Sequence, residues 1–197
     1  MKNMRRGPLG LHAFDDAGLK QLLNEQSTLD VTYLPVGITD HQPPINGYHF
    51  VRGTTQLGEG REIFERGVRC LQEWRVHERV GLSVTSDRPD LEQGSNVVCQ
   101  MRIVGLNVTI ACRVVKIFDD EGQWGFAYGT LPHHVEQGEE LFLVERRSDG
   151  TVHFSVSAFS RPRHPLVKVG APVARAVQRV ITTRYLRAMK ELMTKES

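Results

Sequence analysis

The feature that most constrains this chain is a change in the period of its apolar residues. Between residues 97 and 159, apolar and polar side chains alternate in five segments that short polar turns separate. Alternation with a period of two is typical of half-buried strands, and short turns join antiparallel neighbours. We therefore predict an antiparallel meander of at least five strands, at 97–104, 108–118, 124–131, 141–147 and 151–159.

A long amphipathic helix is predicted to follow the meander, over residues 172–193. Pro172 suits the first turn of a helix, where its missing N–H costs nothing. One arc of this helix is apolar and the opposite arc carries arginine and lysine. Such a helix buries its apolar arc against the concave side of a twisted sheet. The sequence thus predicts an α+β, helix-grip fold with a cavity, and the apolar arc consists of Ala174, Val177, Ile181, Tyr185, Ala188 and Leu192.

Two further helices are predicted before the meander. Residues 15–26 form a short helix that Asp15 or Asp16 can cap, and residues 61–76 form a second one. Gly67 inside the second helix costs about 1 kcal/mol relative to alanine, which indicates close packing against another element. A strand at 49–57 lies between them. We expect residues 1–47 to be an N-terminal segment packed on a helix-grip domain of residues 48–197.

Composition restricts the classes of function. Hydrophobic residues make up 40% of the chain and charged residues 24%, which allows a core without metals or disulfides. The net charge of +2 does not demand a polyanion, so no nucleic acid is expected as partner. No apolar run reaches the roughly 18 residues of a membrane span, which leaves only peripheral contact with a membrane, and the start resembles no secretory signal. We expect a cytoplasmic protein whose cysteines, Cys70, Cys99 and Cys112, are small core residues.

Polar side chains concentrate in a segment that we expect to be a loop between two strands. A histidine beside a carboxylate can act as a general base, so His134 and Glu139 are the catalytic candidates. In the alternative interpretation, Thr130, His134 and Glu139 only hold the loop together through hydrogen bonds. Adjacent histidines in an extended segment point to opposite sides, so we expect no metal site. No cofactor is expected, since the sequence holds no complete nucleotide-binding motif. The cluster comprises Tyr128, Thr130, His133, His134, Glu136, Glu139 and Glu140.

Basic side chains gather from residue 161 to residue 190, and two interpretations remain open for them. They form a solvated face of the terminal helix, or they bind an anionic partner such as a membrane surface. Arg161 stands apart because it lies at a strand end beside two prolines. We predict that Arg161 anchors Glu139 or Glu140 through a bidentate carboxylate pair.

Residues 125–162 resemble an uncharacterised family of bacteria and plants. The signature of that family, G-F-x-Y-G-T-L-P-x-H, then G-E-E-x-F, then A-x-S-R-P, is present in full, and His134 matches the family histidine. The family carries no established activity. The order of elements is also similar to START-like, Bet-v-1-like helix-grip proteins, and this resemblance implies a cavity for sterols, lipids, polyketides or other apolar ligands.

The leading hypothesis is a protein that encloses a small apolar or amphipathic ligand between sheet and terminal helix. Inward residues such as Met101, Ile103 and Phe154 would form the walls, together with Val177 and Ile181 of the helix. One alternative is a cyclase- or hydrolase-like enzyme that uses His134 and Glu139, and another is an interaction module with a basic helix. The candidate ligand-binding residues are Tyr128, Thr130, His134, Glu139, Glu140, Arg161, Phe126 and Tyr185. The oligomeric state stays open.

Overall fold

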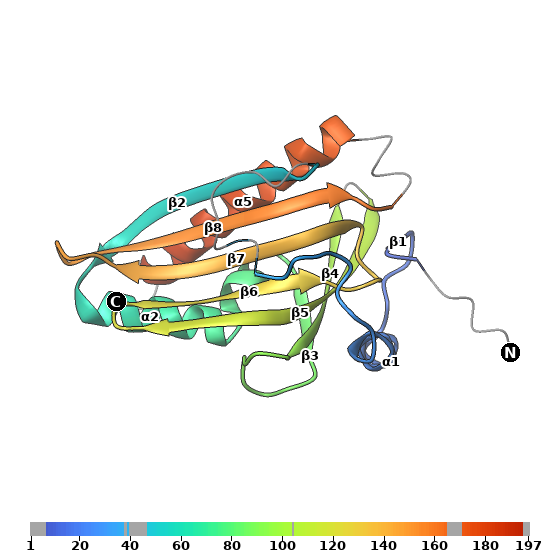
Figure 1. The fold of residues 1–197 in the computed structure, drawn as a ribbon, viewed down its shortest axis with the longest axis horizontal. Helices are drawn as coiled ribbons and strands as arrows, with labels where there is room; N and C mark the ends of the chain where they lie inside the picture. Colours follow the sequence, from blue (N-terminus) through green and yellow to red (C-terminus); the bar gives the residue numbers. More distant parts are fainter. Residues whose placement is uncertain (1–6, 38, 40–46, 104, 165–170, 195–197) are drawn as a thin grey trace, which may run out of the picture.

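The computed structural model describes residues 7–37, 39, 47–103, 105–164 and 171–194. In this part of the chain the strands form one antiparallel sheet, ordered β2-β8-β7-β6-β5-β4-β3, with the short β1 paired to β5. The predicted meander is confirmed, because β3 to β8 follow one another across the sheet (Figure 1). The strands are β1 (Leu9–Gly10), β2 (His49–Glu59), β3 (Ser83–Ser86), β4 (Asn96–Ile103), β5 (Leu106–Asp120), β6 (Gln123–Thr130), β7 (Glu136–Arg146) and β8 (Thr151–Pro162).

Strand β7 begins earlier than the sequence pattern predicted. Residues 136–140 were expected in a loop, but they pair with β8 from Glu136 onward. The alternation is hidden there because polar side chains occupy both faces of the strand. Gly138 makes the pairing sterically feasible, since a Cβ on it would lie 1.8 Å from the carbonyl oxygen of Phe159. The expectation of a loop at Glu139 and Glu140 was therefore wrong.

The predicted helix at 61–76 is divided into two. Helix α2 spans Gly60–Gln72, and a short α3 spans Arg75–Arg79. Trp74 separates them with a left-handed backbone, at a φ of 57°. This conformation turns the chain, and the apolar periodicity continues through it, so periodicity alone could not reveal the break. The close packing predicted at Gly67 is confirmed, since a Cβ there would lie 3.2 Å from Val144 Cγ1.

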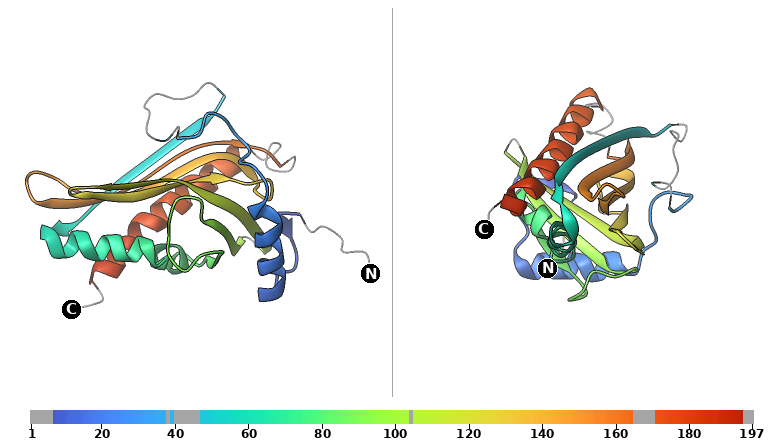
Figure 2. Two further views of the ribbon diagram at one scale, coloured as in Figure 1. Left: turned by 60° about the horizontal axis from the view of Figure 1, so that its bottom comes forward. Right: turned by 90° about the vertical axis from the view of Figure 1, so that its left-hand side faces the viewer.

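The long helix α5 (Ala171–Thr194) lies on the same side of the sheet as α2 and α3. Its buried side chains Tyr185, Met189 and Met193 belong to the main core cluster, together with inward residues of the sheet such as Phe142. Figure 2 shows α2 and α5 under the concave side of the curved sheet. The predicted α+β, helix-grip fold is confirmed. None of the described helices is long and apolar enough to cross a membrane.

Close approach of α5 to strand β2 depends on a glycine. A Cβ added to Gly53 would lie 2.8 Å from Leu186 Cδ1 and 3.0 Å from Thr182 Cγ2, both on α5. Any larger residue would therefore push the helix away from the edge strand. The glycine sets how closely the helix approaches the sheet at this edge.

The other face of the sheet is covered by the N-terminal part of the chain. Asp15 caps the start of helix α1 (Asp16–Ser27), because its side chain accepts a 2.9 Å hydrogen bond from the Gly18 N–H. In Figure 1 the segment after α1 crosses in front of the sheet, whereas α5 runs behind it. A cluster of buried apolar residues joins α1 to β4, to β5 and to the residue that follows β6, namely Leu19, Leu22, Leu23, Val98, Ala111 and Leu131.

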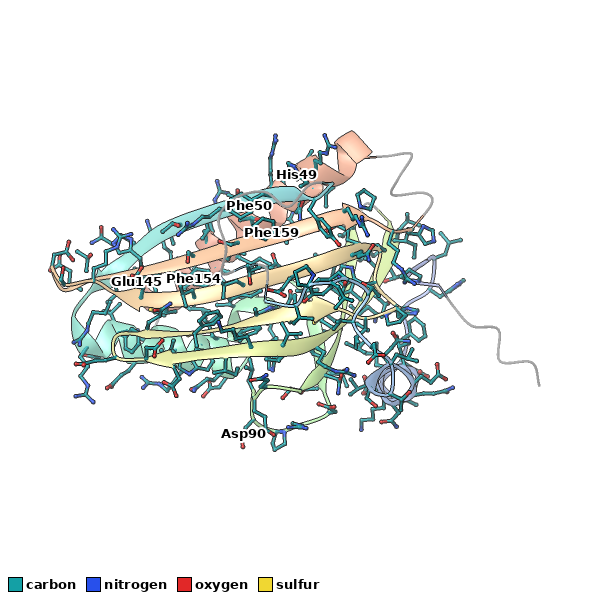
Figure 3. The ribbon with its side chains drawn as sticks, viewed as in Figure 1. His49, Phe50, Asp90, Glu145, Phe154 and Phe159 are labelled. Atoms are coloured by element: carbon teal, nitrogen blue, oxygen red, sulfur yellow. The ribbon has the colours of Figure 1, made fainter. Side chains whose placement is uncertain are left out.

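Aromatic side chains extend this outer layer to the far edge of the sheet. Figure 3 shows Phe50 of β2 beside Phe159 of β8, and their ring centroids are 4.6 Å apart. Tyr33, from the segment after α1, packs on the same cluster. The sheet is therefore covered on both faces, and described residues of the concave face also line a large cavity.

Candidate ligand cavity

A cavity of about 420 Å³ lies between the concave face of the sheet and α5. Of the predicted walls, Met101 and Ile103 of β4 and Val177, Ile181 and Tyr185 of α5 do line it. Phe126 and Phe154 lie instead in the core without exposed surface, and they do not border the cavity. Further apolar lining comes from Leu9, Leu82, Leu106, Val108, Ile110, Val135 and Ala158.

Polar groups converge at one part of this apolar lining. Tyr128 and Glu140 are direct partners across β6 and β7, so their side chains stand on the same face. The Tyr128 hydroxyl donates a 2.9 Å hydrogen bond to Glu140 Oε2. Tyr185 of α5 also lines the cavity, near enough for the charge of Glu140 to act on its hydroxyl. Two phenols and a carboxyl thus border an otherwise apolar cavity.

Burial dominates the electrostatics of this group. Burial raises the pKa of Glu140 to about 7. The hydrogen bond from Tyr128 acts to lower this pKa, and the nearby charge of Glu136 acts to raise it further. Burial and the charge of Glu140 also raise the pKa values of Tyr128 and Tyr185, so both phenols stay protonated. Near neutral pH, Glu140 is therefore the group of this trio that gains or loses a proton.

Glu139 is engaged on the opposite face of the sheet, because successive residues of a strand point to opposite sides. Its carboxylate accepts hydrogen bonds from the Tyr33 hydroxyl at 2.6 Å, the Gly37 N–H at 2.8 Å and the Thr39 N–H at 3.0 Å. The Thr39 hydroxyl adds another bond at 2.5 Å. Although Glu139 borders the cavity, its side chain fastens Tyr33, Gly37 and Thr39 to the sheet.

The predicted pair of His134 and Glu139 is not formed. His134 Nδ1 accepts a 2.9 Å hydrogen bond from the Glu136 N–H, and burial lowers the pKa of His134 to about 4. The ring therefore stays neutral at pH 7 at the border of the cavity. The acid–base alternative loses its basis, because the carboxylate oxygens of Glu139 already accept four bonds from other residues.

Thr130 and Arg161 also have structural partners. The Thr130 hydroxyl contacts that of Thr32 at 2.6 Å and accepts a 3.0 Å bond from the Gly138 N–H. Arg161 Nε donates to Gln137 Oε1 at 3.0 Å, and its guanidinium lies 4.8 Å from the ring centroid of Tyr48. The prediction that Arg161 anchors Glu139 or Glu140 was wrong. Successive side chains of β8 point to opposite faces of the sheet, and Arg161 is on the face away from Glu140. It borders a second, more polar pocket of about 310 Å³.

Sequence analysis missed two polar residues of the cavity and one buried histidine. Gln178 and Ser160 line the cavity and hydrogen-bond each other at 2.8 Å. Gln178 follows Val177 on the inner arc of the helix, so the helical periodicity of the sequence could have identified it as a cavity residue. His77 of α3 has no exposed surface, and its ring lies 5.2 Å from that of Tyr185. Among the described residues, no group of three or more potential ligands could hold a metal ion.

Comparisons with known proteins agree with this architecture. A family profile described as a domain of unknown function (DUF1990) matches residues 32–188. A UPF0548 protein of Deinococcus radiodurans is 33% identical over 158 residues, which cover 73% of this chain and 76% of that protein. A UPF0548 protein of Dictyostelium discoideum is 26% identical over 184 residues, which cover 83% of this chain and 85% of that protein.

Solved structures share the fold at low sequence identity. TTHA0849 from Thermus thermophilus has a TM-score of 0.59 at 12% identity, covering 76% of this chain and 99% of its own. Ara h 8.0201 has a TM-score of 0.50 at 12% identity, covering 75% of this chain and 98% of its own. These neighbours have the Bet-v-1-like helix-grip fold, so the predicted similarity of fold is confirmed. At such identities the likeness concerns the fold alone.

Proposed function

This chain belongs to the DUF1990 family, and we propose that it binds a small apolar or amphipathic molecule in the cavity between its sheet and α5. The observation that carries the proposal is the cavity itself, about 420 Å³ in volume and lined mainly by aliphatic side chains. Small-molecule sites have volumes of about 300–1,000 Å³ and combine apolar walls with a few polar groups. The volume and the lining of this cavity both agree with that description.

Two features favour the interpretation of the cavity as a ligand site over its interpretation as a packing defect. The cavity lies beside a close-packed core in which Phe126, Phe142 and Phe154 have no exposed surface, so the protein packs densely where no ligand is needed. Unfilled apolar volume destabilises a protein, by about 24 cal/mol for each Å³ in measured series. A bound apolar molecule would restore those contacts, which gives the free energy for binding.

The experiment uses the neutral, environment-sensitive dye Nile red as the probe. We expect saturable fluorescence enhancement with the wild-type protein, and loss of at least about tenfold in affinity in Ile181→Trp, which fills the cavity from α5. Val180→Trp is the matched control, because Val180 is the preceding residue, is 51% exposed and does not line the cavity. Equal dye binding by both variants, or no saturable binding by the wild type, would exclude the cavity as the site.

A further inference from the structure

The charges that border the cavity are all of one sign. Its lining includes the carboxyl side chains of Glu136 and Glu140, whereas the carboxylate of Glu139 is turned to the opposite face, and none of the described lining residues is an arginine or a lysine. His134 also lines it but stays neutral at pH 7, because burial lowers its pKa. An apolar chamber with carboxyl groups and without a fixed cation favours a positively charged guest and disfavours an anionic one.

Glu139 and Glu140 differ in how many hydrogen bonds their carboxyl groups accept from the protein. Glu139 accepts bonds from Tyr33, Gly37 and Thr39, which occupy both carboxylate oxygens. Glu140 accepts one bond among the described residues, from the Tyr128 hydroxyl to Oε2, and takes part in no ion pair there. Glu140 is half-buried at the wall of the cavity, and a carboxyl group with spare acceptor capacity in an apolar chamber is stabilised by a ligand that supplies the missing donors.

The surroundings of Glu140 offer hydrogen bonds and aromatic rings. Tyr128 on β6 and Tyr185 on α5 flank it, and Cys99 on β4 and Cys112 on β5 are near enough for its charge to raise their thiol pKa values. On its own strand the neighbouring titratable group is Glu136, and its partner on β8 is Ala158, which carries no charge. Within the described part of the chain, the group therefore meets no cation from the strands and helix that pack against it.

We propose that the ligand is an amphipathic amine, whose ammonium group binds Glu140 beside the hydroxyls of Tyr128 and Tyr185 while its apolar part fills the cavity. This inference rests on the proposed function and names its ligand class. An ammonium group supplies the donors that Glu140 lacks, as a charge-assisted bond. A carboxylate ligand would place a second negative charge against Glu140 and Glu136, and would be rejected.

The arginines near this end of the molecule do not reverse that preference. Arg161 and Arg175 border the second pocket, on the other side of Glu136 and Ser160, rather than the main cavity. Arg161 already pairs with Gln137 and with the ring of Tyr48. An anionic molecule would therefore be drawn toward the second pocket, while the main cavity presents Glu140 to its occupant.

The test compares naphthylethylamine, naphthylethanol and naphthylacetate, which share one apolar body. Isothermal titration at pH 8 should show the amine binding at least about tenfold more tightly than the alcohol, and the acid most weakly. Glu140→Gln should reduce the difference between amine and alcohol to within about threefold. Glu145→Gln, an exposed carboxyl on the same strand, should keep the preference for the amine, and Glu136→Gln should reduce it by less than Glu140→Gln does.

The wild-type protein also provides a test that needs no variant. Amine binding requires ionised Glu140, whose pKa is about 7 in the free protein, so affinity should fall about 30-fold from pH 8 to pH 5.5. Alcohol binding should not fall in this way.

Each outcome has a separate meaning. Equal affinity for the three probes would overturn the amine inference and leave the ligand cavity standing. Loss of the preference in Glu136→Gln rather than Glu140→Gln would overturn the assignment to Glu140. If neither these probes nor Nile red bind, the proposed function itself fails.

Discussion

The hydroxyl of Tyr33 donates a 2.6 Å hydrogen bond to Glu139, across 106 residues of sequence. Tyr33 lies on the outer face of the sheet, where a Cβ on Gly129 would come within 2.3 Å of its hydroxyl oxygen. The next residue after Glu139, Glu140, points into the cavity. Two adjacent glutamates therefore serve opposite faces, one as a structural anchor and the other as the proposed ligand contact.

We predict that Glu139→Gln destabilises the protein by about 2–4 kcal/mol, because an amide replaces one of the two acceptor oxygens while the donors of Tyr33, Gly37 and Thr39 remain buried. Urea unfolding followed by circular dichroism measures the change. Glu145→Gln, which is exposed on the same strand, should change stability by less than about 0.5 kcal/mol. A similar small change for Glu139→Gln would contradict the anchoring role.

Gly53→Ala should cost about 1–3 kcal/mol, because the new methyl group would lie 2.8 Å from Leu186 Cδ1. In a double-mutant cycle with Leu186→Ala, the cost of Gly53→Ala should fall by at least about 1 kcal/mol, since the clashing atom is gone. Gly7→Ala is the control, as a Cβ there meets nothing within 4 Å. Strict additivity of the two changes would show that this contact does not set the position of the helix.

His77 should control part of the acid sensitivity of the protein. Burial lowers the pKa of His77 from 6.5 to about 3, so the unfolded chain binds the proton first as pH falls. The contribution of His77 to the free energy of unfolding is therefore fully present above pH 6.5. It falls by up to about 1.4 kcal/mol per pH unit as the pH is lowered from 6.5 toward 3. Between pH 7 and pH 5, His77→Leu should therefore lose about 2 kcal/mol less than the wild type.

Urea titrations at both pH values measure this difference. Glu140 acts in the opposite direction, because its raised pKa makes its contribution fall as pH rises from 4.5 toward 7. That contribution is present in both proteins and cancels in the comparison. Identical pH profiles of wild type and variant would show that His77 takes up its proton without loss of the fold. The exposed His12 provides a control for the substitution itself, as His12→Leu should change stability at pH 7 by less than about 0.5 kcal/mol.

The cysteines should be inert in the folded protein. Cys70, Cys99 and Cys112 are at most 2% exposed, and burial raises the pKa of the Cys99 thiol to about 12. We expect their reaction with Ellman's reagent at pH 8 to be at least about 1,000-fold slower than in about 6 M guanidinium. Rapid reaction of one thiol in the native state would mean that the sheet opens locally at that strand.

Sequence periodicity was sufficient for the fold because it reports burial directly. The alternation in β4 and β5 and the apolar arc through Ile181 and Tyr185 each require a covered face, and a helix on a concave sheet covers both. The same logic failed at Trp74, where a single left-handed residue divides a helix without changing the apolar pattern. It also failed at β7, where polar residues on both faces hide the strand.

The sequence by itself determined the antiparallel sheet and the terminal helix, because these follow from local period and composition. Only the tertiary structure decided which glutamate faces the cavity, that Arg161 pairs with Gln137, and that Phe126 lies in the core. The physical reason is register: a shift of one residue along a strand exchanges its two faces, and register is set by partners far away in the sequence.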